Sequence, residues 1–365
     1  MSTDLYIYFA VSVVTFVCLF LCCPPCARCL PFLCGNECCC CCKTEGKDLE
    51  GGEGGKHPAS ETRTILPKII FRLPAAFLLG YAISAILVAI YASTFTPYPG
   101  TSFDTCKDTC ADTDLSCCTY TGAIVPYTDV SFTSSGETMH GWWIPSANGS
   151  NFTILYNHGS GANVAVRYRQ DRYQWMRSEL GVNVFVYDYP GYGKSKGSPD
   201  ESKVYQSGRD ALSYVKTRLG QTDAQLLVLG RSMGNAVATK LGSESDTGFR
   251  GLIIQSGWSN YKEVAAAYAG TILGWVVSSM WEPTMSSEEN MKEYKGCYYQ
   301  YHSTADEWIP YRLAEKLWAA ASKVDKSCSV AEMITEDKTL HDDAMTTVQK
   351  DSLKAFVWSV RPAGF

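Results

Sequence analysis

The sequence predicts an α/β fold in which a mostly parallel sheet is flanked by helices, with membrane-spanning helices ahead of it. From about residue 127, short β-rich runs alternate with longer helical patterns, and such alternation produces parallel strands joined by helices. Two uncharged, mostly apolar stretches precede this region, and a helix crosses a bilayer with about 20 such residues. We therefore expect one large folded domain behind an N-terminal membrane region.

The first 126 residues divide into four segments. Residues 1–23 contain an apolar run that we interpret as a transmembrane segment or signal-anchor. A cleaved signal peptide is the alternative, although a basic start and a small-residue cleavage site are lacking. Residues 24–72 are Cys-rich and then rich in Gly, Glu and Lys, which is typical of a flexible linker. Residues 73–95 form the second predicted transmembrane helix, and residues 96–126 are a Cys-containing connector that begins with helix-stopping prolines.

Positive charges predict the orientation of the two spans. Arg28, Lys43, Lys68 and Arg72 lie in the connecting loop, whereas the flanks on the other side are acidic, and positively charged short loops stay in the cytosol. We therefore expect a multi-pass membrane protein whose C-terminal domain faces the lumen or the cell exterior.

Modification signals fit this orientation. The N-terminal cysteine group includes the run Cys38 to Cys42, which lacks the paired spacing and histidines of a zinc site. S-acylation is therefore expected beside the membrane segment, with Cys22, Cys23 and Cys26 as the candidates. Asn148 and Asn151 begin glycosylation sequons, although such tripeptides also arise by chance. Six cysteines outside the N-terminal cluster are enough for three disulfides.

Residues 127–365 contain the alternating elements. The predicted strands are residues 152–156, 182–187, 225–229, 252–255 and 297–301. The predicted helices lie near residues 164–179, 204–219, 233–242 and 310–322. An insertion at about residues 257–288 predicts a small lid. Its Trp275 and Trp281 are candidates for an acyl-binding pocket, and packing against the core or the bilayer is the alternative.

The third predicted strand runs directly into Gly230-Arg-Ser232-Met-Gly234, and a helical pattern follows. A serine between two glycines at a strand-to-helix turn is typical of a nucleophile elbow, where the turn exposes the hydroxyl and the glycines remove side chains that would collide. Ser232 is therefore the candidate nucleophile, with Gly230 and Gly234 shaping the elbow.

A serine hydroxyl needs a base to take its proton and an acid to orient that base. Of the five histidines, His341 is the one that follows the last strand in a loop, and Asp306 follows the strand at residues 297–301. Chain order serine, acid, histidine is thereby satisfied. The alternatives are a capping role for Asp306 before Pro310 with a surface His341, or Glu307, Asp342 or Asp343 as the acid.

An oxyanion formed by attack on a carbonyl requires backbone N–H donors. The amide of Met233, at the start of the helix after Ser232, is one candidate, and the amide of Ser160 in His158-Gly-Ser-Gly is the other. We interpret His158 itself as structural. The arrangement calls for neither a metal nor a cofactor.

These segments resemble the α/β-hydrolase domain-containing proteins of the serine aminopeptidase-like group, especially subgroups 13 and 17. The resemblance rests on residues 158–161, on Tyr-Asp-Tyr-Pro-Gly-Tyr-Gly-Lys-Ser at 187–195, on residues 230–234, and on Asp306 and His341. It implies an α/β-hydrolase fold over roughly residues 127–360, a triad of Ser232, Asp306 and His341, and a structural role for the 187–195 loop. Subgroup 17 removes palmitate from cytosolic proteins and has an acylated N-terminal cysteine cluster similar to Cys22 to Cys26.

We therefore expect a membrane-anchored serine hydrolase that cleaves a long-chain acyl ester or thioester, in the manner of a depalmitoylase, through an acyl-enzyme intermediate. Its substrate is a membrane lipid or an acylated protein. An acylglycerol or lysophospholipid lipase, a carboxylesterase, a serine peptidase and a non-catalytic membrane scaffold are the alternatives. A net charge of −5 provides no basic surface for nucleic acid, so that class of partner is excluded.

Overall fold

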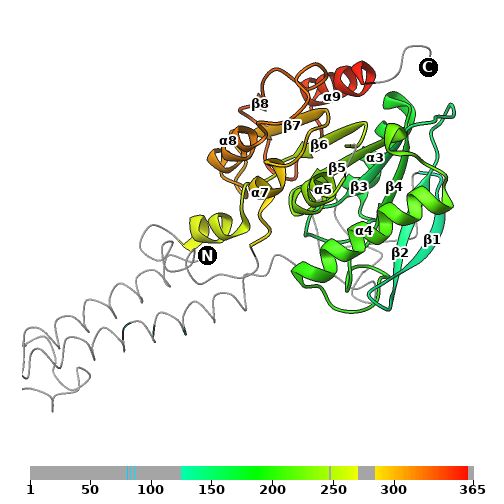
Figure 1. Ribbon diagram of the computed structural model, residues 1–365, viewed down its shortest axis with the longest axis horizontal. Helices are drawn as coiled ribbons and strands as arrows, with labels where there is room; N and C mark the ends of the chain where they lie inside the picture. The colour runs from blue at the N-terminus through cyan, green and yellow to red at the C-terminus, as the bar shows by residue number, and fades with distance from the viewer. Residues whose placement is uncertain are drawn as a thin grey trace, which may run out of the picture. The chain divides into compact units, whose positions relative to one another are not determined.

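The computed structural model describes residues 125–245, 248–269 and 284–360, together with Gly80, Ile83 and Ile86 (Figure 1). The described domain contains an eight-stranded sheet in the order β1-β2-β4-β3-β5-β6-β7-β8. The bounds of its strands are, in chain order, Thr128–Ser134, Glu137–Ile144, Thr153–Asn157, Asn183–Tyr187, Leu226–Arg231, Gly251–Gln255, Tyr298–Ser303 and Ile334–Glu336.

The six strands β3 to β8 run parallel, whereas β1 and β2 form an antiparallel hairpin whose second strand pairs antiparallel with β4. The central strands β3, β4, β5 and β6 are buried along their whole length, which explains their continuous apolar runs. The mostly parallel sheet expected from the sequence is therefore confirmed.

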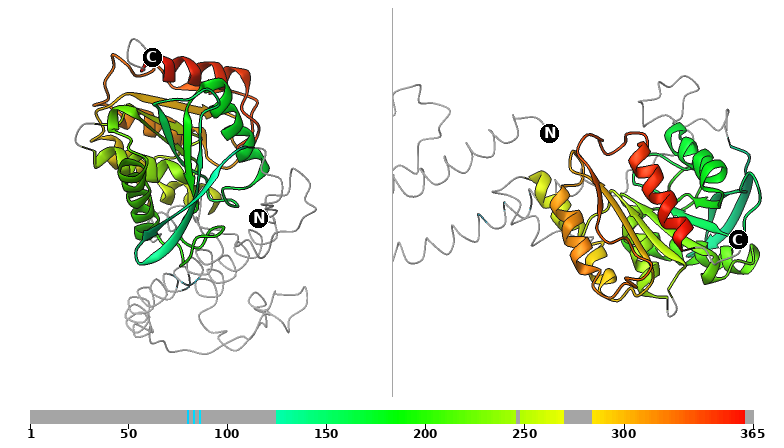
Figure 2. Two further views of the ribbon diagram at one scale, coloured as in Figure 1. Left: turned by 90° about the vertical axis from the view of Figure 1, so that its right-hand side faces the viewer. Right: turned by 90° about the horizontal axis from the view of Figure 1, so that it is seen from above.

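Helices cover both faces of the sheet (Figure 1). On one face, α4 (Glu201–Arg218), α5 (Gly234–Ser243) and α8 (Tyr311–Ala320) share a core with Leu155 and Val228. On the other face, α3 (Arg167–Trp175) and the π-helical turn η2 (Met176–Leu180) border a core that contains Ile154 and Leu229. The helix α9 (Thr347–Ser359), red in Figure 2, packs into this second core. Neighbouring strand residues thus alternate between two cores, as the period of a strand requires.

Short elements complete the domain. The helix α7 (Ser287–Met291) lies in the connection before β7, and the 3-10 turn η3 (Asp223–Gln225) immediately precedes β5. Two polar side chains define helix starts, since Asp200 accepts a hydrogen bond from the Lys203 amide before α4 and Thr346 accepts one from the Gln349 amide before α9. Such N-caps satisfy amides that have no partner within the helix.

The predicted spans at residues 5–23 and 73–95 lie outside the described residues, apart from Gly80, Ile83 and Ile86. Those three residues are helical, and Ile83 and Ile86 are exposed. Within the part of the chain that is described, no helix is both long and apolar enough for a membrane span.

Cys297 and Cys328 form a disulfide that joins the start of β7 to the segment before β8, with Cα atoms 5.2 Å apart. It closes a loop whose ends are 31 residues apart in sequence and which includes β7, Asp306 and α8. The sequence offered six cysteines for three disulfides and did not specify this pairing. The bond fixes one end of the strand that leads to Asp306.

Removal of this bond by Cys328→Ser is expected to lower the free energy of unfolding by about 2–4 kcal/mol, because the unfolded chain regains the freedom of the loop. Urea unfolding of the variant and of the wild type, both without reductant, measures the difference. An unchanged unfolding midpoint would show that the two cysteines are not bonded in the folded protein.

Candidate active site

Ser232 lies in the tight turn between β5 and α5. Its φ is 52°, in the left-handed region that non-glycine residues seldom adopt. The turn needs both glycines, because a Cβ on Gly230 would lie 2.7 Å from the Ala238 Cβ and a Cβ on Gly234 would collide with the Asn157 carbonyl. The amide of Ser232 donates to the carbonyl of Gln255 at the end of β6, at 3.0 Å. The local sequence thus produces a tight strand-to-helix turn with Ser232 in the left-handed conformation.

The structure brings Ser232, His341 and Asp306 together in a chain of hydrogen bonds. The distance from His341 Nε2 to Ser232 Oγ is 2.9 Å, and the distance from His341 Nδ1 to Asp306 Oδ2 is 2.8 Å. A carboxylate only accepts, so the proton on this imidazole belongs at Nδ1, and Nε2 is left to accept from the serine hydroxyl. All three residues are buried, at 7 to 8 % exposure.

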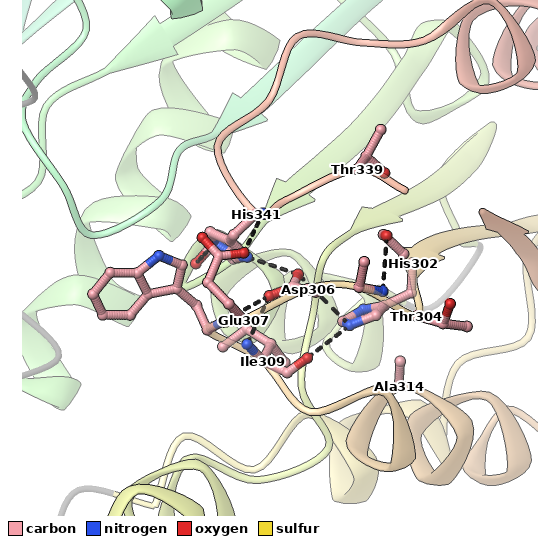
Figure 3. A network of polar contacts seen from close by, with 12 residues as sticks. His302, Thr304, Asp306, Glu307, Ile309, Ala314, Thr339 and His341 are labelled. Atoms are coloured by element: carbon pink, nitrogen blue, oxygen red, sulfur yellow. Dashed lines mark hydrogen bonds and ion pairs between the residues drawn. The ribbon is translucent and has the colours of Figure 1, made fainter. Parts of the chain in front are cut away.

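The carboxylate of Asp306 is fixed on both oxygens (Figure 3). Oδ1 accepts from the amides of Trp308 at 3.0 Å and Ile309 at 2.7 Å, while Oδ2 faces His341 and lies 3.7 Å from His302 Nε2. Burial raises the pKa of Asp306, but the hydrogen bond and charge of His341, the neighbouring His302 and the Ile309 amide outweigh it, and the pKa is lowered overall. Asp306 is therefore an ionised acceptor at neutral pH.

The three substitute acids have other partners. Glu307 accepts from the His341 backbone amide at 2.9 Å, Asp342 pairs with Arg231 at 3.2 Å, and Asp343 accepts from the Leu340 amide at 2.7 Å. Each of these contacts holds the loop that carries His341, and none reaches its imidazole. Arg231, the residue before Ser232, also donates to the His341 carbonyl, so the nucleophile turn and the histidine loop are joined directly.

The segment after β3 lies beside Ser232, because a Cβ on Gly159 would approach the Ser232 Cβ to 3.2 Å. Ser160, one candidate oxyanion donor, is in this segment, and Met233, the other, immediately precedes α5. The 187–195 loop supports the segment, since the Tyr189 hydroxyl donates to the His158 carbonyl at 2.8 Å and Asp188 accepts from the Val164 amide at 2.9 Å.

The remaining described histidines are structural in their contacts. His158 is fully buried, and burial followed by the nearby charge of Arg169 lowers its pKa well below the usual value, so it is neutral. His302 is also buried with a lowered pKa, mainly because of burial, and its Nε2 donates to the Ile309 carbonyl at 2.9 Å. His140 contacts Asp129 at 2.7 Å.

Several predicted site residues lie outside the described residues: Trp275, Trp281, Cys22, Cys23 and Cys26. Asn148 and Asn151 are described and exposed in the connection between β2 and β3. Among the described residues, the grouping with metal-ligand spacing is Cys297, Asp325 and Cys328, and the disulfide between its two cysteines leaves no thiolate for a metal.

Part of this domain matches a known protein family. Residues 151–293 match the family described as serine aminopeptidase, S33, and this segment contains the elbow and the segment after β3. The domain has the α/β-hydrolase fold. The predicted resemblance to the serine aminopeptidase-like group is thereby confirmed.

The proteins similar in sequence to this chain have varied names. The uncharacterized protein YfhR of Escherichia coli K12 is 28 % identical over 204 residues, which are 53 % of this chain and 68 % of that protein. Protein bem46 of Schizosaccharomyces pombe is 30 % identical over 146 residues, 39 % of this chain and 47 % of that protein. The lysophosphatidylserine lipase ABHD12 of Bos taurus is 28 % identical over 194 residues, 50 % of this chain and 48 % of that protein.

Among solved structures, the esterase Pf2001 of Pyrococcus furiosus aligns with this chain at a TM-score of 0.52 and 19 % identity, covering 72 % of this chain and 97 % of that one. At this identity the likeness shows the fold alone, and the chemistry must be argued from the site.

Proposed function

We propose that this protein is a membrane-anchored serine hydrolase that cleaves long-chain acyl esters of lipids through an acyl-enzyme intermediate. The supporting observation is the chain of hydrogen bonds from Asp306 through His341 to Ser232, with distances of 2.8 Å and 2.9 Å. Ser232 is the nucleophile, His341 the general base and acid, and Asp306 the residue that orients the imidazole.

The reaction has two halves. Ser232 Oγ attacks the ester carbonyl carbon as its proton passes to His341 Nε2, and the tetrahedral intermediate carries its negative charge on the former carbonyl oxygen. The amides of Ser160 and Met233 are the proposed donors to this oxyanion. Collapse releases the alcohol, which takes the proton from His341. Water, deprotonated by His341, then attacks the acyl-enzyme and releases the fatty acid.

Two exposed apolar side chains favour an acyl substrate. Trp308 and Leu340 are 49 % and 51 % exposed, and they lie two residues after Asp306 and one residue before His341. The Glu307 carboxylate accepts from the His341 amide at 2.9 Å, so the two segments that carry these apolar side chains are neighbours. The Tyr268 hydroxyl, near the end of helical residues 261–269, donates to the Trp308 carbonyl at 2.9 Å and holds this segment. We infer that these residues contact the acyl chain.

The proposed anchor and orientation favour a lipid over a cytosolic protein. A disulfide between Cys297 and Cys328 is typical of oxidising compartments, and the exposed sequons at Asn148 and Asn151 are suited to the same side. Both features fit a domain held outside the cytosol by the predicted spans 5–23 and 73–95. The similarity to a lysophosphatidylserine lipase points to a lysophospholipid as a first substrate to test.

The deciding experiment compares two substrates with the full-length protein in detergent micelles: 1-oleoyl-lysophosphatidylserine and an S-palmitoylated peptide. We expect fatty acid release from the lipid ester, and none by Ser232→Ala. Preference for the thioester would instead support the depalmitoylase activity that the subgroup 17 resemblance implies. Absence of Ser232-dependent turnover of both would contradict the assignment as an acyl hydrolase.

Trp308→Ser is expected to raise KM for long-chain esters about tenfold, corresponding to about 1.4 kcal/mol of lost binding, and to leave hydrolysis of a butyrate ester unchanged. Steady-state kinetics over a series of chain lengths measures this. Trp358→Ser is the matched control, because Trp358 is 55 % exposed on α9, where Lys354 stacks on its ring. Equal effects of the two substitutions would refute a role for Trp308 in acyl binding.

A further inference from the structure

Arg169, in the first turn of α3, is only 1 % exposed, and its guanidinium holds the segment after β3. Nη2 donates to the carbonyl of Gly159 at 2.9 Å and also to that of Gly161, while Nη1 donates to the carbonyl of Asn163 at 2.6 Å. All of these acceptors are main-chain oxygens of a single short segment. Arg169 therefore determines which way that segment's peptide groups face.

The orientation of one peptide group matters for catalysis. A trans peptide is planar, so its C=O and N–H bonds point in opposite directions. The Gly159 carbonyl points toward Arg169, and His158 Nδ1 also lies 2.7 Å from it. Consequently the amide of Ser160, in the same peptide group, points away from Arg169. A Cβ on Gly159 would lie 3.2 Å from the Ser232 Cβ, so this peptide group is a neighbour of the nucleophile.

Burying a guanidinium group in the protein interior has a large cost in free energy. Removing its charge from water is unfavourable unless the group is well bonded, and an apolar side chain of similar size would fill the same space with less cost. Arginine differs from lysine in presenting several donors in a fixed planar fork. A fork can bind several carbonyls at once and hold them in one arrangement, whereas an ammonium group on a flexible stem cannot impose the same geometry.

We propose that Arg169 is a positioning residue for the oxyanion hole, and that it aims the Ser160 amide at the oxyanion by holding the carbonyls of Gly159 and Gly161. Arg169 itself does not touch the substrate. Its effect is specific to the transition state, because the donor that it orients becomes most strongly bonded when negative charge develops on the carbonyl oxygen. This inference rests on the serine hydrolase function proposed above.

Arg169→Lys and Arg169→Met are the test variants. We expect kcat to fall about 10- to 100-fold, which is less than the roughly 10²- to 10³-fold decrease in kcat caused by complete loss of an oxyanion donor. KM should stay within about threefold of the wild-type value. A long-chain trifluoromethyl ketone forms a hemiketal oxyanion with Ser232, so its inhibition constant should rise by the same factor as kcat falls. The inhibition constant of a non-cleavable ether analogue should stay unchanged.

Arg167→Met is the matched control, because Arg167 lies two residues earlier, is exposed and pairs with Asp171 at 3.2 Å. Tyr189→Phe tests the same segment with a smaller change, since it removes only the hydroxyl that donates to the His158 carbonyl. It should lower kcat without altering KM, and it decides the matter if both Arg169 variants fail to fold.

Wild-type kcat in a folded Arg169→Lys protein, or equal weakening of the ketone and the ether, would overturn the proposal. Failure of the hydrolase assignment has a different signature, in which wild type and Arg167→Met both lack turnover that depends on Ser232.

Discussion

Ser232→Ala should abolish ester hydrolysis and labelling by a fluorophosphonate probe, with a loss in kcat of about 10⁶-fold. The reason is chemical, because alanine has no hydroxyl to form the acyl-enzyme or to donate the hydrogen bond of 2.9 Å to His341. Labelling of purified protein followed by in-gel fluorescence measures the nucleophile directly, and fatty acid release measures turnover.

Ser256→Ala is a matched control for that substitution. Ser256 follows β6, the strand beside β5, is buried, and shares the left-handed conformation with φ of 49°. It should label at the wild-type rate. Equal labelling of Ser232→Ala and wild type would refute the assignment of the nucleophile.

The strained turn at Ser232 is expected to lower the stability of the protein while making its activity possible. Ser232 has a φ of 52°, and a non-glycine residue in this region costs of order 1 kcal/mol or more. Ser232→Gly relieves that strain and is expected to raise the free energy of unfolding by about 1 kcal/mol while eliminating activity. The backbone strain at Ser232 therefore results from the same turn that exposes its hydroxyl.

The central part of the fold was predictable from sequence because its signal is local. The continuous apolar run of residues 226–229 and the two glycines around Ser232 specify strand, turn and helix within about ten neighbouring positions. The expected helix at 164–179 exists as α3 followed by the π turn η2. Helix α9 and strand β8, which is three residues long, were not located from sequence, and so short a strand has no measurable periodicity.

The residues that shape the site were less accessible to sequence reasoning. Arg169 binds main-chain carbonyls, and a carbonyl is present at every position, so no residue pattern marks its partners. Arg231 lies within the Gly-Arg-Ser-Met-Gly motif at 230–234, but its contact with the His341 carbonyl joins residues 110 positions apart and therefore has no local sequence signal. The pairing of Cys297 with Cys328 also depends on the register of β7 and the segment before β8, which composition does not reveal.

Asp306→Asn should lower kcat about 10⁴-fold, as expected when the acid of such a triad loses its charge and the imidazole its correct tautomer. The structure dictates how the new amide must sit. Oδ1 accepts from the amides of Trp308 and Ile309, so the asparagine oxygen has to occupy that place, and its NH₂ group then faces His341 Nδ1. An NH₂ donor forces the imidazole proton onto Nε2, which no longer accepts from Ser232.

Glu307→Gln separates this effect from general disturbance of the histidine loop. Glu307 accepts from the His341 amide, and glutamine keeps an acceptor oxygen in nearly the same place, so kcat should change less than about tenfold. Pre-steady-state acylation rates for both variants, with KM and the unfolding midpoint, complete the comparison. A large loss in Glu307→Gln with a mild one in Asp306→Asn would transfer the acid role to Glu307. The contact of 2.8 Å between Asp306 and His341 Nδ1 argues for the opposite ranking, because Asp306 accepts from the imidazole, whereas Glu307 accepts from the backbone amide of His341.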